Sequence, residues 1–512
     1  MSRRYSMGFV MVLALALSAA WGQDSASQQE PVPAPEGSQP QQPVPANGPD
    51  NPVPPIIENP PISGVDLPNL EPHAAPLSYL QLGGHASESV DSNVQNSLGG
   101  SGTHSVSFAL GSVDLQHLWR NYDLALDYLG GVGYYNARGL GLKQIEELGL
   151  DQQITWKRGK LGIRDAFSYQ PEGTFGSAYG AVGLTGAGLS STGLLGFNGG
   201  TVFGALGQVP RIMNLSVVDA VENLTPKSSI TITGGYGLVH FLDNQPGTRN
   251  SFIGSNEVSG EAGYNRILGR HDQGAIVYAY QGFQFSTGTN FYSHIIQLMW
   301  GHRITGRMDF LVGVGPQFTQ INHLLLPATA AQNPTVPPCV FAATSQGTPE
   351  LVCPQNDLRI SAAGRAVLRY RFPKTSLDLT YAHYITSGSG FFAGAKSDIA
   401  QLSASRPLTR IWSLGSDIGF SRNSRVLPIT CPASSAATCP GVSANIYQYG
   451  FAGVSFHRKF GRTMHAFASY QFNYLAFDDS YCQTFNGPCN RIAQRSVGTI
   501  GVDWTPRPIR LD

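Results

Sequence analysis

Charged residues are scarce in this chain. Only 13% of its 512 residues are charged, and 33 basic residues balance 33 acidic ones to a formal net charge of zero. Soluble proteins carry about 25% charged residues, and a neutral balance gives no attraction for nucleic acid. No run of about 20 apolar residues, the length of a membrane-spanning helix, follows the N-terminal region. The composition therefore excludes helical membrane spans there and makes nucleic acid an unexpected partner.

Signatures of catalysis and of metal binding are also missing. The chain has no Gly-x-Ser-x-Gly elbow, no Gly-Lys-Ser/Thr phosphate loop and no His-Glu-x-x-His pair. Its 12 histidines are scattered, and no loop shows the cysteine spacing that zinc prefers. We expect no enzyme, no metal and no cofactor, although distant Ser, His and Asp side chains that converge on one wall would escape a motif search.

The first residues predict export. Arg3 and Arg4 precede an apolar stretch between Gly8 and Ala20, which is too short to span a membrane. Ala20-Trp21-Gly22 then provides a small-x-small cleavage site before Gln23. Residues 1–22 are therefore predicted to be a signal peptide.

Residues 23–76 are rich in Pro, Gln, Asn, Ser and Ala and have no hydrophobic periodicity. Such a composition cannot bury enough apolar surface to offset the entropy of the chain, so we predict a disordered, partly polyproline arm. Two roles are open for this periplasmic arm: a passive spacer, or a contact with peptidoglycan.

From Leu77 onward the composition changes. Segments rich in Tyr, Phe, Val and Gly are joined alternately by tight polar turns and by long connections. Outer-membrane barrels separate short periplasmic turns from long outer loops in this way, whereas a soluble sandwich has no reason to do so. We predict an all-β transmembrane antiparallel barrel over residues 77–506, with about 18 strands and 16 as the next choice, and a short periplasmic tail at 507–512. The tight turns lie at Arg120-Asn121, Lys157-Arg158-Gly159, Thr225-Pro226-Lys227, Gly269-Arg270-His271, Thr305-Gly306-Arg307, Pro373-Lys374, Pro407-Leu408-Thr409 and Phe460-Gly461-Arg462.

The segment from Leu358 to Phe372 shows the strand alternation most clearly. One face is apolar, and the other carries Arg359, Arg365, Arg369 and Arg371. In a soluble sandwich the arginines would face bulk water, and in a membrane barrel they would face the lumen. Because an Arg against lipid costs about 2 to 4 kcal/mol at the midplane, we assign the arginine face to the lumen, with Arg365 near mid-pore.

The charges on the inward registers are of both signs. Opposed basic and acidic walls would create a transverse field that screens solutes, and the alternative is that the charges pair and hold the wall together. A turn at Pro373-Lys374 would place Arg369 opposite Asp378 and Arg365 opposite Ala382. The predicted pore-lining residues are Arg164, Glu257, Glu261, Arg359, Arg365, Arg369, Arg371, Asp378 and Arg495.

The six cysteines fall into three pairs, each within one long connection. Six cysteines allow 15 pairings, and pairing within a loop is the simplest because loops on a barrel rim are separated in space. An oxidising compartment lets such bonds persist. We therefore predict disulfides between Cys339 and Cys353, between Cys431 and Cys439, and between Cys482 and Cys489.

One long connection, between Gly173 and Pro210, contains no charged residue. An apolar, glycine-rich loop would be an aggregation risk in water, so we expect it to fold into the lumen or across the mouth. A flexible surface loop is the alternative. Two strand segments, Ile446 to His457 and Gln273 to Thr287, are apolar on both faces, and we expect them to line a loop that folds inward.

The last strand carries a family resemblance. Gly498, Ile500, Val502 and Trp504 alternate with other residues and end on an aromatic side chain. With the signal peptide, this pattern resembles the C-terminal insertion signal of bacterial outer-membrane β-barrels of porin type, except that a tail begins at Thr505. The resemblance implies a bacterial outer-membrane location, contacts with outer-membrane lipid and the barrel-insertion machinery, and a homo-oligomer as an option.

A barrel of this strand number leaves an aqueous channel. We expect passive diffusion of small hydrophilic solutes through the outer membrane, with a preference for anions near Arg365. Two alternatives stay open: a surface structural or adhesion barrel that presents disulfide-stapled loops, and a barrel that exports polysaccharide. No plug domain is visible before Leu77, so energy-coupled uptake ranks below these.

Overall fold

The computed structural model describes residues 61–63, 78–95, 97–100, 102–119, 121–137, 139–170, 210–242, 252–325, 340–343, 349–372, 374–388, 390–427, 444–484 and 489–511. These ranges all belong to one compact unit, Pro43–Asp512. The predicted signal peptide and most of the predicted arm lie outside them. No helix within these ranges is long and apolar enough to cross a membrane.

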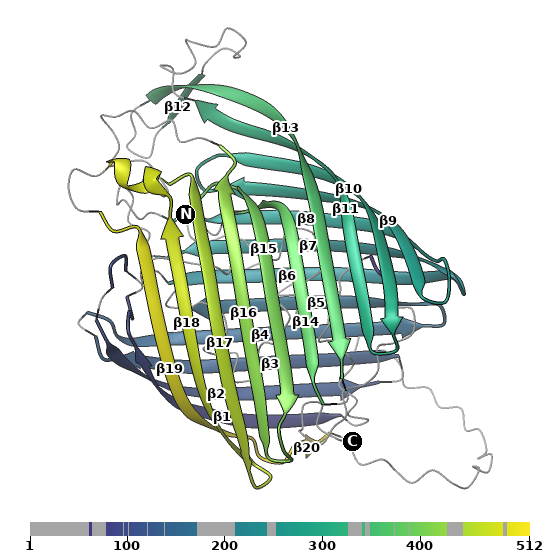
Figure 1. Ribbon diagram of the computed structural model, residues 1–512, viewed down its shortest axis with the longest axis vertical. Helices are drawn as coiled ribbons and strands as arrows, with labels where there is room; N and C mark the ends of the chain where they lie inside the picture. The colour runs from purple at the N-terminus through teal and green to yellow at the C-terminus, as the bar shows by residue number, and fades with distance from the viewer. Residues whose placement is uncertain are drawn as a thin grey trace, which may run out of the picture. The chain divides into compact units, whose positions relative to one another are not determined.

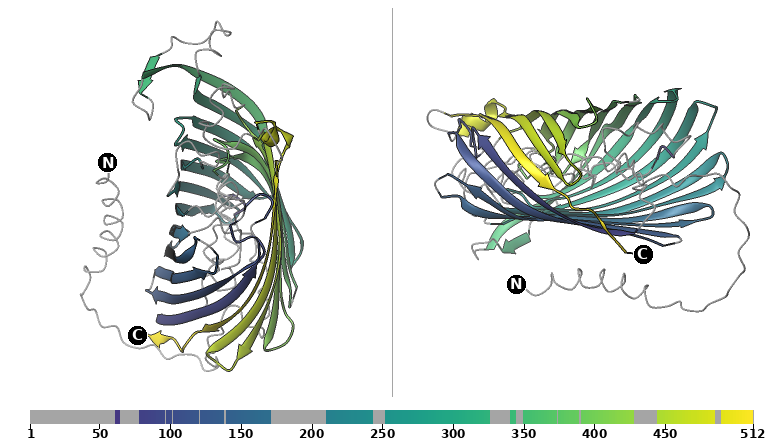
Figure 2. Two further views of the ribbon diagram at one scale, coloured as in Figure 1. Left: turned by 90° about the vertical axis from the view of Figure 1, so that its left-hand side faces the viewer. Right: turned by 90° about the horizontal axis from the view of Figure 1, so that it is seen from below.

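Eighteen antiparallel strands, β1 to β11 and β13 to β19, form a closed barrel, whose wall Figure 1 shows. Each strand pairs with the next one along the wall, and β1 pairs with β19 so that Gly84 lies opposite Trp504 and Asp91 opposite Val497. Seen from below, the purple-to-teal wall faces the green-to-yellow wall (Figure 2). The predicted all-β antiparallel barrel of eighteen strands is confirmed.

The strands are long enough to cross a membrane at a tilt. They are β1 (Tyr79–Asp91), β2 (His104–Leu118), β3 (Tyr122–Tyr135), β4 (Gly141–Trp156), β5 (Gly159–Gln170), β6 (Arg211–Thr225), β7 (Ser228–Phe241), β8 (Ser255–Ile267), β9 (Asp272–Phe285), β10 (Asn290–Thr305), β11 (Met308–Leu325), β13 (Pro349–Arg371), β14 (Ser376–Thr386), β15 (Ala395–Pro407), β16 (Trp412–Arg425), β17 (Ile446–Phe460), β18 (Met464–Phe477) and β19 (Ile492–Trp504).

Most of the short connections lie at one end of the barrel, and the long ones lie at the other end. At one end, turns of two to four residues join the strands, and we call this end the periplasmic rim. The other end, the outer mouth, carries the long connections, including those that follow β5 and β16. Two connections at the outer mouth are short, those after Tyr135 and Phe285. The predicted separation of turns from loops therefore holds with these two exceptions.

Three elements were not predicted from the sequence. The short β12 (Val340–Ala343) pairs with the first residues of β13. β13 itself begins at Pro349 rather than near Leu358, because β11 continues to Leu325 and pairs with this extension. A 3₁₀ helix, η5 (Asp479–Thr484), follows β18. The predicted tail contains β20 (Ile509–Arg510), which pairs with the first residues of β1 below the end of β19.

Side chains alternate between the two faces of the wall. On β8 the polar residues Ser259 and Glu261 are buried, whereas Val258 and Tyr264 are exposed. On β13 the apolar residue Leu358 is 70% exposed, and Arg365 on the opposite face is 8% exposed. The face of β13 that carries Arg365 is the buried face of the closed wall, and the face that carries Leu358 is the exposed one.

Candidate functional site: the barrel lumen

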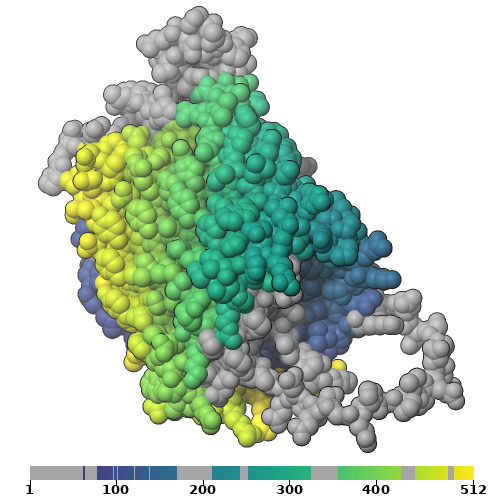
Figure 3. Space-filling model, turned by 45° about the vertical axis from the view of Figure 1, so that its right-hand side comes forward, coloured from purple at the N-terminus to yellow at the C-terminus, as the bar shows by residue number. Residues whose placement is uncertain are grey.

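Many large apolar side chains are exposed on the outer face of the wall, one side of which is drawn in Figure 3. Leu298, Val314 and Ile500 are each at least 60% exposed there. An exposed apolar surface of this extent is stable against lipid rather than water. Trp156 and Trp504 lie at the periplasmic ends of their strands, where outer-membrane barrels place aromatic girdles. The closed wall is therefore built as a membrane-spanning β-barrel.

Ion pairs on the inner wall join β11 to β13 and β13 to β14. Arg369 lies opposite Asp378, as predicted, but it also lies opposite Asp309 on its other side. Its guanidinium donates to both carboxylate oxygens of Asp309, at distances between 2.5 and 3.2 Å. Asp378 accepts from Arg371 at 2.7 Å. The predicted register is correct, and Arg369 also bonds to Asp309 because an inward Arg can reach the strand on either side.

Two further arginines of the predicted pore lining are paired. Arg164 on β5 donates to Asp219 at 2.9 Å and lies 3.7 Å from a carboxylate oxygen of Asp151. Arg495 on β19 donates two hydrogen bonds to Asp91 on β1, at 2.8 and 2.5 Å, and both side chains are buried. This last pair ties together the two strands that close the barrel.

The remaining predicted pore-lining residues lie on the inner face without forming one site. Glu257 and Glu261 are buried on β8, and Arg359 lies opposite Thr319 toward the outer mouth, where it is exposed. Arg365 lies opposite Ala382, as predicted, and its guanidinium donates to the carbonyl oxygen of Ile62 at 3.2 Å. The charges are thus spread along the wall rather than gathered at one constriction.

A loop at the outer mouth, residues 387–394 between β14 and β15, folds into the lumen. We call it the mouth loop; its residue 389 is outside the described ranges. Phe391 and Phe392 are both completely buried. Phe391 packs edge-on against Tyr447 of β17 and Phe477 of β18, with ring centroids 5.1 and 5.3 Å apart, and lies 5.8 Å from Phe252 before β8. Because β8 and β18 are half the barrel apart in strand order, these contacts bridge the mouth.

The backbone of the mouth loop is fitted to this position. The N–H of Ile253 donates to the carbonyl oxygen of Gly390 at 2.8 Å, which fixes the loop to the connection before β8. Gly388, Gly390 and Gly394 all have positive φ angles near 80°, a conformation that favours glycine. A Cβ on Gly394 would also lie 1.8 Å from the ring of Phe291. Glycine is therefore required at Gly394 for the loop to turn inward.

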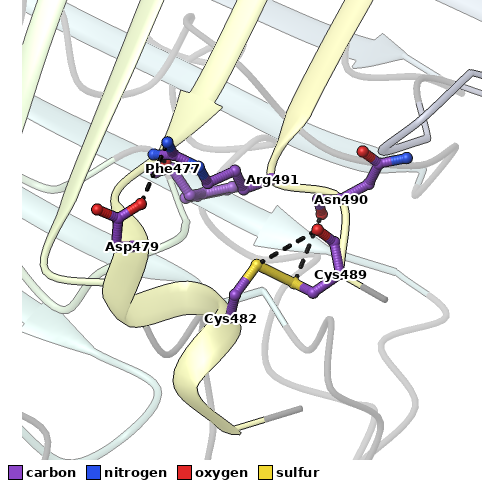
Figure 4. The surroundings of a disulfide bond; sticks show 6 residues. All are labelled: Phe477, Asp479, Cys482, Cys489, Asn490 and Arg491. Carbon is purple, nitrogen blue, oxygen red and sulfur yellow. Dashed lines mark hydrogen bonds and ion pairs between the residues drawn. A yellow bond between two sulfur atoms is a disulfide. The ribbon is translucent and has the colours of Figure 1, made fainter. Parts of the chain in front are cut away.

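The outer rim carries one disulfide among the described residues (Figure 4). Cys482 in η5 and Cys489 are joined, with their Cα atoms 5.7 Å apart. Beside the bond, Arg491 donates to the carbonyl oxygen of Phe477 at 3.1 Å and pairs with Asp479 at 3.1 Å. The predicted disulfide between Cys482 and Cys489 is confirmed. The predicted bonds Cys339–Cys353 and Cys431–Cys439, like the predicted constriction between Gly173 and Pro210, involve residues or side chains outside the described ranges.

Ser, His and Asp side chains do converge on the inner wall, beside the periplasmic end of β19. His85 shares hydrogen bonds with Asp503 at 2.7 Å and with Ser87 at 2.9 Å. A hydrolytic triad also needs oxyanion donors beside the serine, but β1 is paired on both sides at Ser87, opposite Phe108 and Gly501. The backbone N–H groups there are used by the sheet. We read the group as a tie between β1 and β19.

No protein-family model and no curated protein matches the chain. Among solved structures it is similar to the ferric-catecholate import receptor Fiu from E. coli K12, with 8% identity, 83% of this chain and 81% of that chain covered, and a TM-score of 0.40. It is also similar to Pseudomonas aeruginosa OccK2 (OpdF) in complex with glucuronate, with 8% identity, coverages of 85% and 98%, and a TM-score of 0.36. For Pseudomonas aeruginosa OprD the identity is 7%, the coverages are 85% and 96%, and the TM-score is 0.35.

Sequence reasoning missed the residues that occupy the lumen. The mouth loop reads as an ordinary glycine-rich turn, and Ile62 lies in a segment predicted to be disordered. One signal pointed the right way: β9 and β17 are apolar on both faces. Their inner residues Phe285, Tyr447 and Tyr449 are buried in the clusters that receive the mouth loop and its neighbours. The expectation that these two strands line an inward-folded loop is confirmed.

Proposed function

We propose that the chain is an outer-membrane channel through which small hydrophilic solutes diffuse passively. The observation that supports this most directly is the pairing of an apolar outer face with a polar and charged inner face on a closed wall of eighteen strands. A barrel of this strand number encloses an aqueous lumen rather than a packed core. Neither a cofactor nor an energy source is needed for diffusion through it.

The mouth loop limits which solutes pass. Phe391 and Phe392 insert an apolar bridge across part of the outer mouth, so a solute must pass beside it through the polar remainder of the lumen. Arg359 is exposed on the inner face near this level, and Arg365 lies deeper. A cation at the entrance concentrates anions locally, which supports a mild preference for small anionic solutes.

Planar-bilayer recording of the refolded full-length chain tests the proposal. We expect ohmic steps of constant size and, under a salt gradient, a reversal potential displaced toward the anion. A correctly folded barrel that gives no steps would contradict the proposal and favour a surface structural or adhesion role. A reversal potential displaced toward the cation would contradict the anion preference alone.

A further inference from the structure

Residues 61–63 lie inside the barrel, although they belong to the region predicted as a free arm. We call them the lumen segment. The side chains that bond them, Thr231 on β7, Asn265 on β8 and Arg365 on β13, all lie on the inner face of the wall. Ser63 itself is only 4% exposed. The lumen segment therefore has a defined place on the wall.

Asn265 recognises the backbone of the lumen segment. Its Oδ1 accepts from two successive backbone N–H groups, those of Ile62 at 3.1 Å and Ser63 at 2.9 Å. Its Nδ2 donates to the hydroxyl of Ser63 at 2.6 Å, and this hydroxyl also shares a hydrogen bond with Thr231 at 2.5 Å. Arg365 completes the set by donating to the carbonyl oxygen of Ile62. Both backbone N–H groups and the Ser63 hydroxyl are thus satisfied by buried wall side chains, as buried polar groups require.

Two wall glycines make room for the side chains of the lumen segment. A Cβ on Gly263 would lie 2.3 Å from the hydroxyl oxygen of Ser63, and a Cβ on Gly301 would lie 3.0 Å from Cγ2 of Ile62. Ile62 packs against an apolar patch of the inner wall that includes Met299 and Leu311. The wall therefore complements an aliphatic side chain followed by a small hydroxyl side chain.

One row of paired residues connects the two polar ends of this site. Asn265 lies opposite Ala275, which lies opposite Met299, which lies opposite Gly313, which lies opposite Arg365. The small residues within the row leave space for a bound backbone between the polar ends. A lone contact of a loose arm would need no such arrangement across five strands.

We propose that this part of the wall is a peptide-binding site, that residues 61–63 occupy it in the resting barrel, and that their departure widens the pore. The ligand class is a peptide with an aliphatic residue followed by Ser or Thr. The widening rests on the proposed channel function, but the binding site does not. Any solute that follows the wall between Asn265 and Arg365 must pass or displace the lumen segment.

A disulfide between the lumen segment and the wall tests the site directly. In the double variant Ser63→Cys/Thr231→Cys, the sulfurs replace hydroxyl oxygens that lie 2.5 Å apart. We expect oxidation to form the cross-link, seen as a mass change in a peptide digest, and to lower the conductance relative to the reduced channel. The matched control is Ser89→Cys/Thr499→Cys, whose hydroxyl oxygens lie 2.8 Å apart across β1 and β19. This pair links wall to wall, so its redox state should leave the conductance unchanged, as should reduction of the wild type.

A second variant acts from the wall. Gly301→Val places methyl groups against Ile62, and apart from Ile62 the nearest atom to the new Cβ is 4.0 Å away. We expect the conductance to rise although the variant adds volume to the lumen, because the lumen segment is expelled. Gly498→Val adds the same volume to the outer face, where a Cβ meets nothing within 4 Å, and should leave the conductance unchanged.

The outcomes separate the two proposals. A conducting barrel in which Ser63→Cys/Thr231→Cys forms no cross-link overturns the binding site. A cross-link that leaves the conductance the same in both redox states, or a fall in conductance for Gly301→Val, overturns the widening. If the wild type is silent in bilayers, the channel function fails together with the widening, while the cross-link still supports the binding site.

Discussion

The substitution Phe391→Ala should open the outer mouth. Phe391 is fully buried between two opposite parts of the wall, so its ring holds the mouth loop across the lumen. Removing a fully buried Phe side chain costs about 3 to 5 kcal/mol. Part of this is lost from the edge-on contacts with Tyr447 and Phe477, each worth about 0.5 to 1.5 kcal/mol.

The lost packing energy destabilises only the docked state of the mouth loop, because the undocked loop has no such contacts. A loss of 3 kcal/mol shifts the ratio of docked to undocked loop on the order of a hundredfold. We expect single-channel conductance to rise and current noise to increase as the loop moves in and out. Phe420→Ala is the matched control, because Phe420 faces outward on β16 and is 47% exposed.

Conductance and noise equal to those of the wild type, in a barrel that retains its resistance to unfolding, would refute this reasoning. The mouth loop would then pack against the wall without narrowing the path. A rise in conductance for Phe420→Ala as well would point to a general loosening of the barrel instead.

The remaining predictions concern charge and stability. Arg365→Glu should displace the reversal potential toward cations, and an unchanged potential would place Arg365 outside the conducting path. Asp91→Asn leaves the buried guanidinium of Arg495 without its carboxylate and should destabilise the barrel by about 3 to 5 kcal/mol, measured as a lower denaturant midpoint for loss of strand signal. Cys482→Ser should cost about 2 to 3 kcal/mol by the loop-entropy relation, and its effect should vanish when the wild type is compared in reductant. Gly394→Ala should raise the conductance as Phe391→Ala does, since the new Cβ collides with the ring of Phe291.

The strands were predictable because most of them alternate between apolar residues, which face lipid, and polar residues, which face the lumen. Leu358 and Ile360 point to lipid and Arg359 and Arg365 to the lumen, so that the alternation alone sets the register of β13. The tight turns then give the order of the strands, and their separation from the long loops distinguishes a membrane barrel from a sandwich. These are local signals, and a closed antiparallel wall is built almost entirely from local pairs.

The contents of the lumen were not predictable, because they depend on contacts between distant parts of the chain. Ile62 and Ser63 are fixed by Asn265 and Arg365, which follow them by more than 200 residues. Nothing near Ile62 marks it as buried. The ion pair between Arg369 and Asp309 was missed for the same reason, since β11 and β13 are neighbours only across a long connection.

Liposome swelling with a graded series of neutral sugars shows whether the lumen is a continuous aqueous path. We expect wild-type barrels to admit small sugars and exclude larger ones, and we expect Phe391→Ala to move the size limit upward. Liposomes that contain correctly folded barrels but swell with no sugar of any size would contradict the claim that the lumen is a continuous aqueous path.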